Sequence, residues 1–143
     1  MTNKPNNKEE KKTPLEIAQE SVLNAIDTGA SELYLYAIPG FPSLLPDIAR
    51  LSKLKVLSIN GIQREPDPFV YSYLITFPYF ELSKLIELTV LNLSYNNFET
   101  IPTEIGHLNK LEALNLSSNL LATIPPEIGQ LSNLETLNLS NNK

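Results

Sequence analysis

The sequence contains no cysteine, and its 143 residues include one histidine and only five glycines. Without cysteine the chain has no disulfide, no thiol nucleophile and no thiolate metal site, so its stability must come from packing. Five glycines leave little material for a phosphate-binding loop, and neither G-x-S-x-G nor a paired-histidine metal motif occurs. We therefore expect a protein that is not an enzyme and that uses no cofactor and no metal.

A positive net charge and a long hydrophobic run are also missing. The formal charge is -5 and the pI is near 4.9, so we expect neither nucleic acid nor acidic membrane as a partner. The opening "MTNKPNNKEEKK" is polar and lysine-rich, and no apolar stretch has signal-peptide or membrane-spanning length. We expect a cytoplasmic protein in which residues 1–12 form a disordered tail.

What the chain does contain is enough apolar material for one globular domain, with 42% hydrophobic and 19% charged residues. Its first structural signal is "TPLEIAQESVLNAIDTG". Thr13 and Glu16 form a T-x-x-E capping box, Pro14 suits the first helical position, and Gly29 suits the left-handed residue after the last turn. These signals predict a helix over residues 14–27. Its apolar residues recur at intervals of three and four and form one stripe: Leu15, Ala18, Val22, Ala25 and Ile26.

An internal repeat fills the second half of the sequence. The segments "LTVLNLSYNNFETIPTEIGHLNK", "LEALNLSSNLLATIPPEIGQLSN" and "LETLNLSNNK" superimpose without gaps, so Leu91, Leu114 and Leu137 are equivalent, with a period of 23. Two degenerate copies precede them, "ASELYLYAI" with Leu33 and "LKVLSINGI" with Leu57 in the equivalent place. The sequence therefore predicts five units, of which the last is incomplete.

The shared pattern L-x-x-L-x-L-x-x-N resembles the signature of leucine-rich repeats, over about residues 30–143. The "IPxEIGxL" halves at residues 101–108 and 124–131 are similar to the bacterial and plant intracellular (Ras-group-related) branch, and the "TGASELYL" after the helix resembles the lead-in of such bacterial proteins. The resemblance implies an α/β fold, a right-handed leucine-rich repeat solenoid. It would have a curved parallel sheet of about five short strands and an N-terminal capping helix at residues 13–29.

The residues themselves explain why such a repeat folds. Leu114 and its neighbour Asn115 point to opposite sides of a strand, so the leucines face inward and each coil stacks on the next. Asn96, Asn119 and Asn142 come where the chain turns off the strand, and a buried amide there can satisfy backbone groups of the same and the next coil. We expect these three asparagines to be structural.

The C-terminal end lacks anything that resembles a cap, so its apolar residues are expected to face water: Leu131, Leu134, Leu137 and Leu139. Solenoid ends need caps because their strands have an unpaired edge. Either the array is shortened from a longer one, or this edge meets another chain, or the end is frayed. Self-association through the uncapped C-terminal edge is therefore one expectation.

In leucine-rich repeat proteins the concave side of the sheet is the usual recognition surface, and here it should be small, polar and almost uncharged. Serine and asparagine are also the ordinary filling of such repeats, so a surface without a ligand remains an alternative. Tyrosines at the N-terminal end add flat amphipathic area of the kind enriched at interfaces. The candidate partner-binding residues on this face are Tyr34, Tyr36, Ser58, Asn60, Asn92, Tyr95, Asn115 and Asn138.

An insertion interrupts the second unit, because Leu57 and Leu91 are 34 positions apart and about 11 residues are extra. We place it at about residues 63–80. It contains six of the chain's eleven aromatic residues. Either the segment packs back on the coil through Phe69, Leu74, Phe77 and Phe80, or it protrudes and binds a partner. The candidate contacts for the second case are Phe69, Tyr71, Tyr73 and Tyr79.

We expect a non-catalytic interaction module that binds a protein or peptide on the concave face and the aromatic insertion. Two alternatives stay open. The chain is similar to the repeats that precede a GTPase in bacterial Roco-type proteins, which implies a sensor or regulatory arm of a longer signalling protein. Bacterial leucine-rich proteins are also sometimes secreted effectors.

Overall fold

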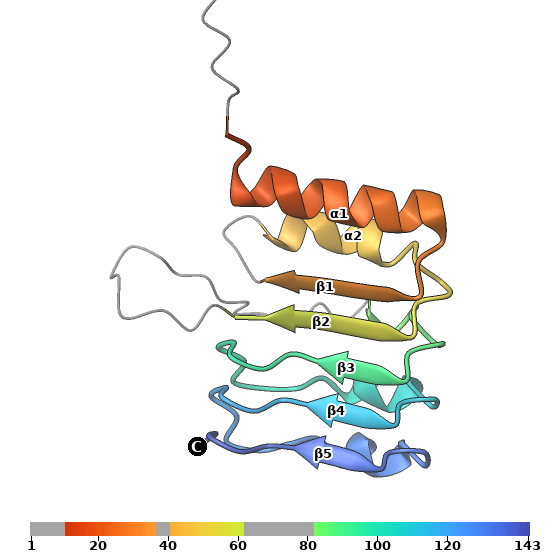
Figure 1. The fold of residues 1–143 in the computed structure, drawn as a ribbon. Coiled ribbons are helices and arrows are strands. Elements are labelled where there is room, and N and C mark those ends of the chain that lie inside the picture. The colour runs from red at the N-terminus through yellow and green to blue at the C-terminus, as the bar shows by residue number, and fades with distance from the viewer. Residues whose placement is uncertain (1–10, 37–40, 62–81) are drawn as a thin grey trace, which may run out of the picture.

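A computed structural model of the chain describes residues 11–36, 41–61 and 82–143. It shows a helix lying on one end of a stack of parallel strands, with short helical segments behind the sheet (Figure 1). The strands are β1 (Glu32–Tyr36), β2 (Val56–Asn60), β3 (Val90–Asn92), β4 (Ala113–Asn115) and β5 (Thr136–Asn138). The helical segments are α1 (Pro14–Thr28), η1 (Phe41–Leu44), α2 (Leu45–Ile48), η2 (Thr103–His107) and η3 (Pro126–Gln130).

The five strands form one parallel sheet in the order of the sequence, β1-β2-β3-β4-β5. Leu33 pairs with Leu57, Leu57 with Leu91, Leu91 with Leu114, and Leu114 with Leu137. The predicted equivalence of these leucines is therefore confirmed. The long step between the second and third units leaves this register intact.

Helix α1 closes the N-terminal end of the stack as predicted. The Thr13 hydroxyl accepts a hydrogen bond from the Glu16 N–H at 3.3 Å, and the Glu16 carboxylate accepts one from the Thr13 N–H at 2.7 Å. Gly29 ends the helix in the left-handed conformation, with φ 65°. The inner residues of the stripe, Ala18, Val22 and Ala25, are buried in the core, and Leu15 and Ile26 are partly buried against it.

The core runs through the middle of the coils. The strand leucines Leu57, Leu91 and Leu114 are at most 1% exposed, and from the opposite wall Ile105 and Leu108 are at most 2% exposed. Full burial of a leucine or isoleucine side chain contributes roughly 1.5–3 kcal/mol. Since each coil supplies only a few such side chains, neighbouring coils must stack to form a stable core.

The predicted asparagine ladder is present, and its direction differs from the prediction. The Asn119 Nδ2 donates to the carbonyl oxygens of Leu116 in its own coil and Leu93 in the preceding coil, both at 3.0 Å. Its Oδ1 accepts from the Phe98 N–H at 3.1 Å. Asn96 and Asn142 bond to the preceding coil in the same way. The expectation that these amides reach the next coil was wrong.

The physical reason lies in the turn after the strand. The Ser117 N–H, which would continue the ladder to Leu93, donates instead to the Asn115 Oδ1 at 3.0 Å. The Leu93 carbonyl is then left without a ladder partner, and a buried carbonyl needs one. The Asn119 amide fills that place, which lies on the side of the preceding coil.

Several expectations concern residues outside the described part of the chain. These are most of the tail expected over 1–12, the insertion expected over 63–80, and the candidate contacts Phe69, Tyr71, Tyr73 and Tyr79. Within residues 11–36, 41–61 and 82–143, no helix is long and apolar enough to cross a membrane. The same residues contain no group of three histidine, aspartate or glutamate side chains placed to hold a metal ion.

Candidate functional site

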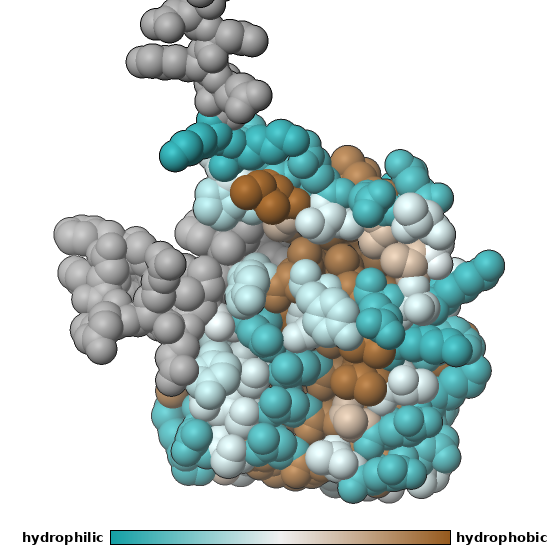
Figure 2. Space-filling model, in the orientation of Figure 1, coloured by the Kyte–Doolittle hydropathy of each residue, from teal (hydrophilic) through white to brown (hydrophobic). Residues whose placement is uncertain are grey.

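The exposed side chains of the five strands form one surface, which we call the sheet face. In β1 the residues alternate strictly, so that Leu33 and Leu35 are buried while Glu32, Tyr34 and Tyr36 are exposed. Tyr34 is 63% exposed and Tyr36 is 66% exposed. Figure 2 looks onto this face and shows hydrophobic surface between hydrophilic side chains. The two tyrosines predicted for partner binding are therefore exposed to solvent, while the leucines that alternate with them anchor the strand in the core.

The register arranges the other candidates in a row. Tyr34 is in line with Ser58, Asn92, Asn115 and Asn138, at about 4.8 Å from one strand to the next. Ser58 is only 6% exposed, and its hydroxyl donates to the Asn60 Oδ1 at 3.3 Å. Ser58 therefore offers a partner much less surface than its neighbours in the row.

In the three asparagines of this row, the side-chain oxygen is used in a structural hydrogen bond and the side-chain nitrogen is not. Each Oδ1 accepts the backbone N–H two residues further on, at 3.1 Å for Asn92 and 3.0 Å for Asn115 and Asn138. The Nδ2 groups make no hydrogen bond to any residue that the structure describes. Each side chain is fixed by its own turn and still has donors to offer, which suits a recognition surface.

Tyr95 lies at the edge of the sheet face, just after β3, and its backbone is left-handed with φ 57°. The residues at the same place in the next two coils, Ser118 and Asn141, have φ 54° and 56°. A left-handed backbone costs an L-residue roughly 1–2 kcal/mol, and short polar residues tolerate it best. Tyr95 is 38% exposed, so the chain places a bulky aromatic side chain on the surface at a strained position.

One carboxylate lies on this otherwise uncharged face. The Tyr34 hydroxyl donates to the Glu32 Oε2 at 3.0 Å, and this hydrogen bond raises the pKa of Tyr34 above its ordinary value near 10. The remaining strand residues of the face carry no charge. Glu32 and Tyr34 thus form a polar pair beside the aromatic surface.

The C-terminal end of the stack is exposed to a degree that the inner coils are not. Ile124 is 38% exposed and Leu137 is 37% exposed, whereas their counterparts Ile101 and Leu114 are 6% and 1% exposed. Leu131 is buried at 5% against the preceding coil, so the expectation that it faces water was wrong. Leu134 and Leu139 are partly buried, and the expectation is met most fully by Leu137.

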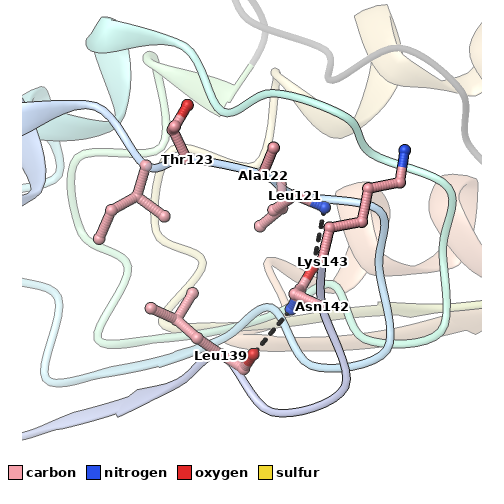
Figure 3. A pocket seen from close by; sticks show the side chains of 7 residues that line it. Leu121, Ala122, Thr123, Leu139, Asn142 and Lys143 are labelled. Atoms are coloured by element: carbon pink, nitrogen blue, oxygen red, sulfur yellow. Dashed lines mark hydrogen bonds between the residues drawn. The ribbon is translucent and has the colours of Figure 1, made fainter.

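A shallow pocket of about 220 Å³ opens at this end, lined mainly by the last two turns of the chain (Figure 3). Asn142 is one of the lining residues; its Nδ2 donates to the Leu139 carbonyl at 2.9 Å and its Oδ1 accepts from the Leu121 N–H at 3.0 Å. Leu121 and Leu139 give it an apolar side. Four of the equivalent residues in the preceding coil are at most 6% exposed: Phe98, Ile101, Leu116 and Asn119.

Residues 82–121 match the protein family described as leucine rich repeat. A solved structure of a leucine-rich repeat protein from Leptospira interrogans superimposes on 87% of this chain with a TM-score of 0.68 and 29% identity. The chain folds as a leucine-rich repeat solenoid with an N-terminal helix. No curated protein matches it.

Two plant receptors contain similar leucine-rich repeat solenoids. The ectodomain of the receptor kinase SOBIR1 from Arabidopsis thaliana covers 68% of this chain, with a TM-score of 0.54 and 31% identity. The ectodomain of the receptor kinase GASSHO1/SCHENGEN3 from Arabidopsis thaliana, solved in complex with CASPARIAN STRIP INTEGRITY FACTOR 2, covers 77%, with a TM-score of 0.54 and 29% identity. The present chain spans 34% of the Leptospira chain, 49% of SOBIR1 and 12% of GASSHO1/SCHENGEN3.

Proposed function

We propose that this leucine-rich repeat solenoid is a non-catalytic module that binds a protein or peptide partner at the N-terminal half of its sheet face. The observation that carries the proposal is the exposure of Tyr34 and Tyr36, at 63% and 66%, on a strand whose other side is buried. Tyrosine is enriched at protein interfaces because it offers a large contact area with a polar tip. Little reason exists for two such residues side by side on a surface that stays in water.

The mechanism is preorganisation. The tyrosines are carried by a five-stranded sheet in continuous register, so their backbone loses little conformational freedom when a partner binds. The asparagine Nδ2 groups of the neighbouring strands add fixed hydrogen-bond donors. Tyr95 supports the proposal, because backbone strain at an exposed aromatic residue is more readily explained by recognition than by stability.

The solved relatives support the class of partner. The GASSHO1/SCHENGEN3 ectodomain was solved with a bound partner, so a solenoid of this kind can serve recognition. The "IPxEIGxL" halves of the repeats form η2 and η3, and on this pattern we propose that the repeats are of the bacterial and plant intracellular type. The comparisons favour neither a regulatory arm of a longer signalling protein nor a secreted effector over a simple binding module.

A peptide-display selection tests the proposal. A random library is selected on the wild-type chain, and the enriched peptides are then measured on a Tyr34→Ala/Tyr36→Ala variant. We expect the double variant to bind about tenfold more weakly or worse, which corresponds to about 1.4 kcal/mol, with an unchanged circular dichroism spectrum. A Glu104→Ala/His107→Ala variant removes two exposed side chains of η2, away from the sheet face, and should bind like the wild type. Equal binding by both variants would refute the proposed surface.

A further inference from the structure

A groove of about 370 Å³ lies between the first half of α1 and the second half of β1. Its lining is mainly apolar, with Ile17, Ala18 and Ser21 on the helix side and Tyr34, Leu35 and Tyr36 on the strand side. Ile17 is 53% exposed and is not part of the stripe that α1 buries. Ligand pockets in proteins measure roughly 300–1,000 Å³, so this groove is large enough for a ligand group.

The strand side of the groove is a free sheet edge. In a parallel pair each strand uses alternate residues for one neighbour, and the Val56 N–H donates to the Ser31 carbonyl at 3.0 Å. The backbone N–H and carbonyl groups of Ser31, Leu33 and Leu35 therefore point toward β2. The backbone groups of the exposed residues Glu32, Tyr34 and Tyr36 point toward the opposite edge of the sheet. Helix α1 lies along that edge (Figure 1). Among the described residues, β1 pairs with β2 alone, and no backbone hydrogen bond outside the helices and strands involves Tyr34 or Tyr36.

Glu32 supplies a negative charge near the groove, and it forms no ion pair with another described residue. The ion pairs among the described residues are Lys12–Glu20, Arg50–Asp47 and Lys110–Glu87. Glu32 takes part in none of them, and among these residues the Tyr34 hydroxyl is the hydrogen-bond donor to its carboxylate. It lies two residues before Tyr34, which is about 6.6 Å along the strand. A cation that bound Glu32 would thus sit next to the groove.

We propose that the groove binds an extended peptide with a bulky apolar side chain and, two residues away, a lysine or arginine. The apolar side chain lies between Ile17 and Tyr34, the peptide backbone pairs with the free edge at Tyr34 and Tyr36, and the basic side chain reaches Glu32, two residues before Tyr34. Addition of a strand to a sheet edge gives affinity through the main chain and specificity through alternate side chains. The inference rests on the proposed function and specifies its ligand.

Nuclear magnetic resonance with defined peptides tests this occupant. The labelled chain is titrated to millimolar concentrations with SGLSRSG and SGRSLSG, which cover both strand directions. We expect saturable shifts of the Ile17, Ser21, Tyr34 and Tyr36 amides with one of them. Replacing its leucine by serine, its arginine by glutamate, or methylating the backbone nitrogen between them should each weaken binding about tenfold. Equal binding by these control peptides, or no shift with either probe, would overturn the proposal.

Protein variants separate the groove from the rest of the surface. Ser21→Leu fills the groove, and Gln19→Leu adds the same side chain roughly 200° away from Ile17 around the helix. We expect the first variant to lose peptide binding and the second to keep it. Glu32→Gln should weaken binding of the arginine peptide. The variant should still bind the leucine peptide more tightly than its serine counterpart. The idea fails if the two leucine variants bind alike.

Two further outcomes identify other occupants. Peptide shifts confined to β3, β4 and β5 would overturn the groove and leave the sheet-face proposal standing, because the display selection measures that proposal separately. If deletion of residues 1–10 alone shifts the Ile17 and Tyr36 amides, the groove holds the chain's own N-terminal segment, and the proposal of an external peptide is wrong. Unchanged amides in that deletion variant support it.

Discussion

At the scale of single residues, Gly61 occupies a position that a side chain cannot enter without moving the backbone. A Cβ atom built there would lie 1.3 Å from the Tyr95 carbonyl oxygen, because the Gly61 N–H reaches across to the Ser94 carbonyl at 3.1 Å. The two residues lie on neighbouring coils at the ends of β2 and β3. The two backbones can approach each other this closely because Gly61 has no side chain.

We predict that Gly61→Ala lowers the free energy of unfolding by about 1–3 kcal/mol, the usual cost of overpacking. Urea denaturation followed by circular dichroism measures the change. Gly129→Ala is the matched control, since no atom lies within 4 Å of the Cβ it would add and its φ is not positive. That variant should match the wild type. Equal losses from both substitutions would show that the contact with Tyr95 is not the cause.

The residue scale is also where the sequence was least informative. Ser58 and Asn92 occupy equivalent places in the repeat, yet Ser58 is buried and Asn92 is only partly buried. The direction of the asparagine ladder depends on which N–H the Asn115 side chain takes, and the repeat pattern does not specify that choice. Such details follow from competition among neighbouring hydrogen bonds, which periodicity alone cannot resolve.

At the scale of elements, the N-terminal cap stabilises α1, the helix that covers the first coil. Thr13→Ala removes the hydroxyl that accepts from the Glu16 N–H, and loss of such an N-cap typically costs about 1 kcal/mol. We predict that loss in the free energy of unfolding at neutral pH. Thr123→Ala, an exposed threonine outside any helix, is the control and should be neutral.

The same cap should make stability depend on pH. The hydrogen bonds from the Thr13 N–H and hydroxyl lower the pKa of Glu16 below its ordinary value. A carboxyl group whose pKa is lower when folded stabilises the fold above its unfolded pKa, about 4.3. That contribution is lost as the pH falls through the folded pKa. The advantage of the wild type over Glu16→Ala in urea should therefore be larger at neutral pH than well below pH 4, and a constant difference would contradict this role of the charge.

Elements were predictable because each rests on a pattern that packing enforces. The capping box and Gly29 fixed both ends of α1 to within one residue. The equivalence of Leu91, Leu114 and Leu137 fixed the register of three strands, because a shift by one residue would turn the leucines out of the core. The groove was missed, although Ile17 carried a signal: an apolar residue off the buried stripe of an amphipathic helix. Only the structure places it opposite the free edge of β1.

At the scale of the whole molecule, the two ends of the stack differ. Helix α1 covers the first coil, while at the other end Ile124 and Leu137 are more than a third exposed and β5 pairs on one side only. Because α1 buries the apolar side of the first coil, apolar contact between two copies would join their C-terminal ends. Such an arrangement is two-fold symmetric and closes as a dimer, whereas head-to-tail stacking would grow into a filament.

We accordingly propose that the chain self-associates through this end, and we predict a concentration-dependent dimer in sedimentation velocity. Leu137→Glu should shift the equilibrium to the monomer, because the dimer would bury a charge without a partner. Leu23→Glu is the matched control, since Leu23 is 50% exposed on α1 and its substitution should leave the dimer intact. A wild-type chain that sediments as a monomer at every concentration, or a Leu23→Glu variant that dissociates equally, would show that the exposed end of the stack does not drive association.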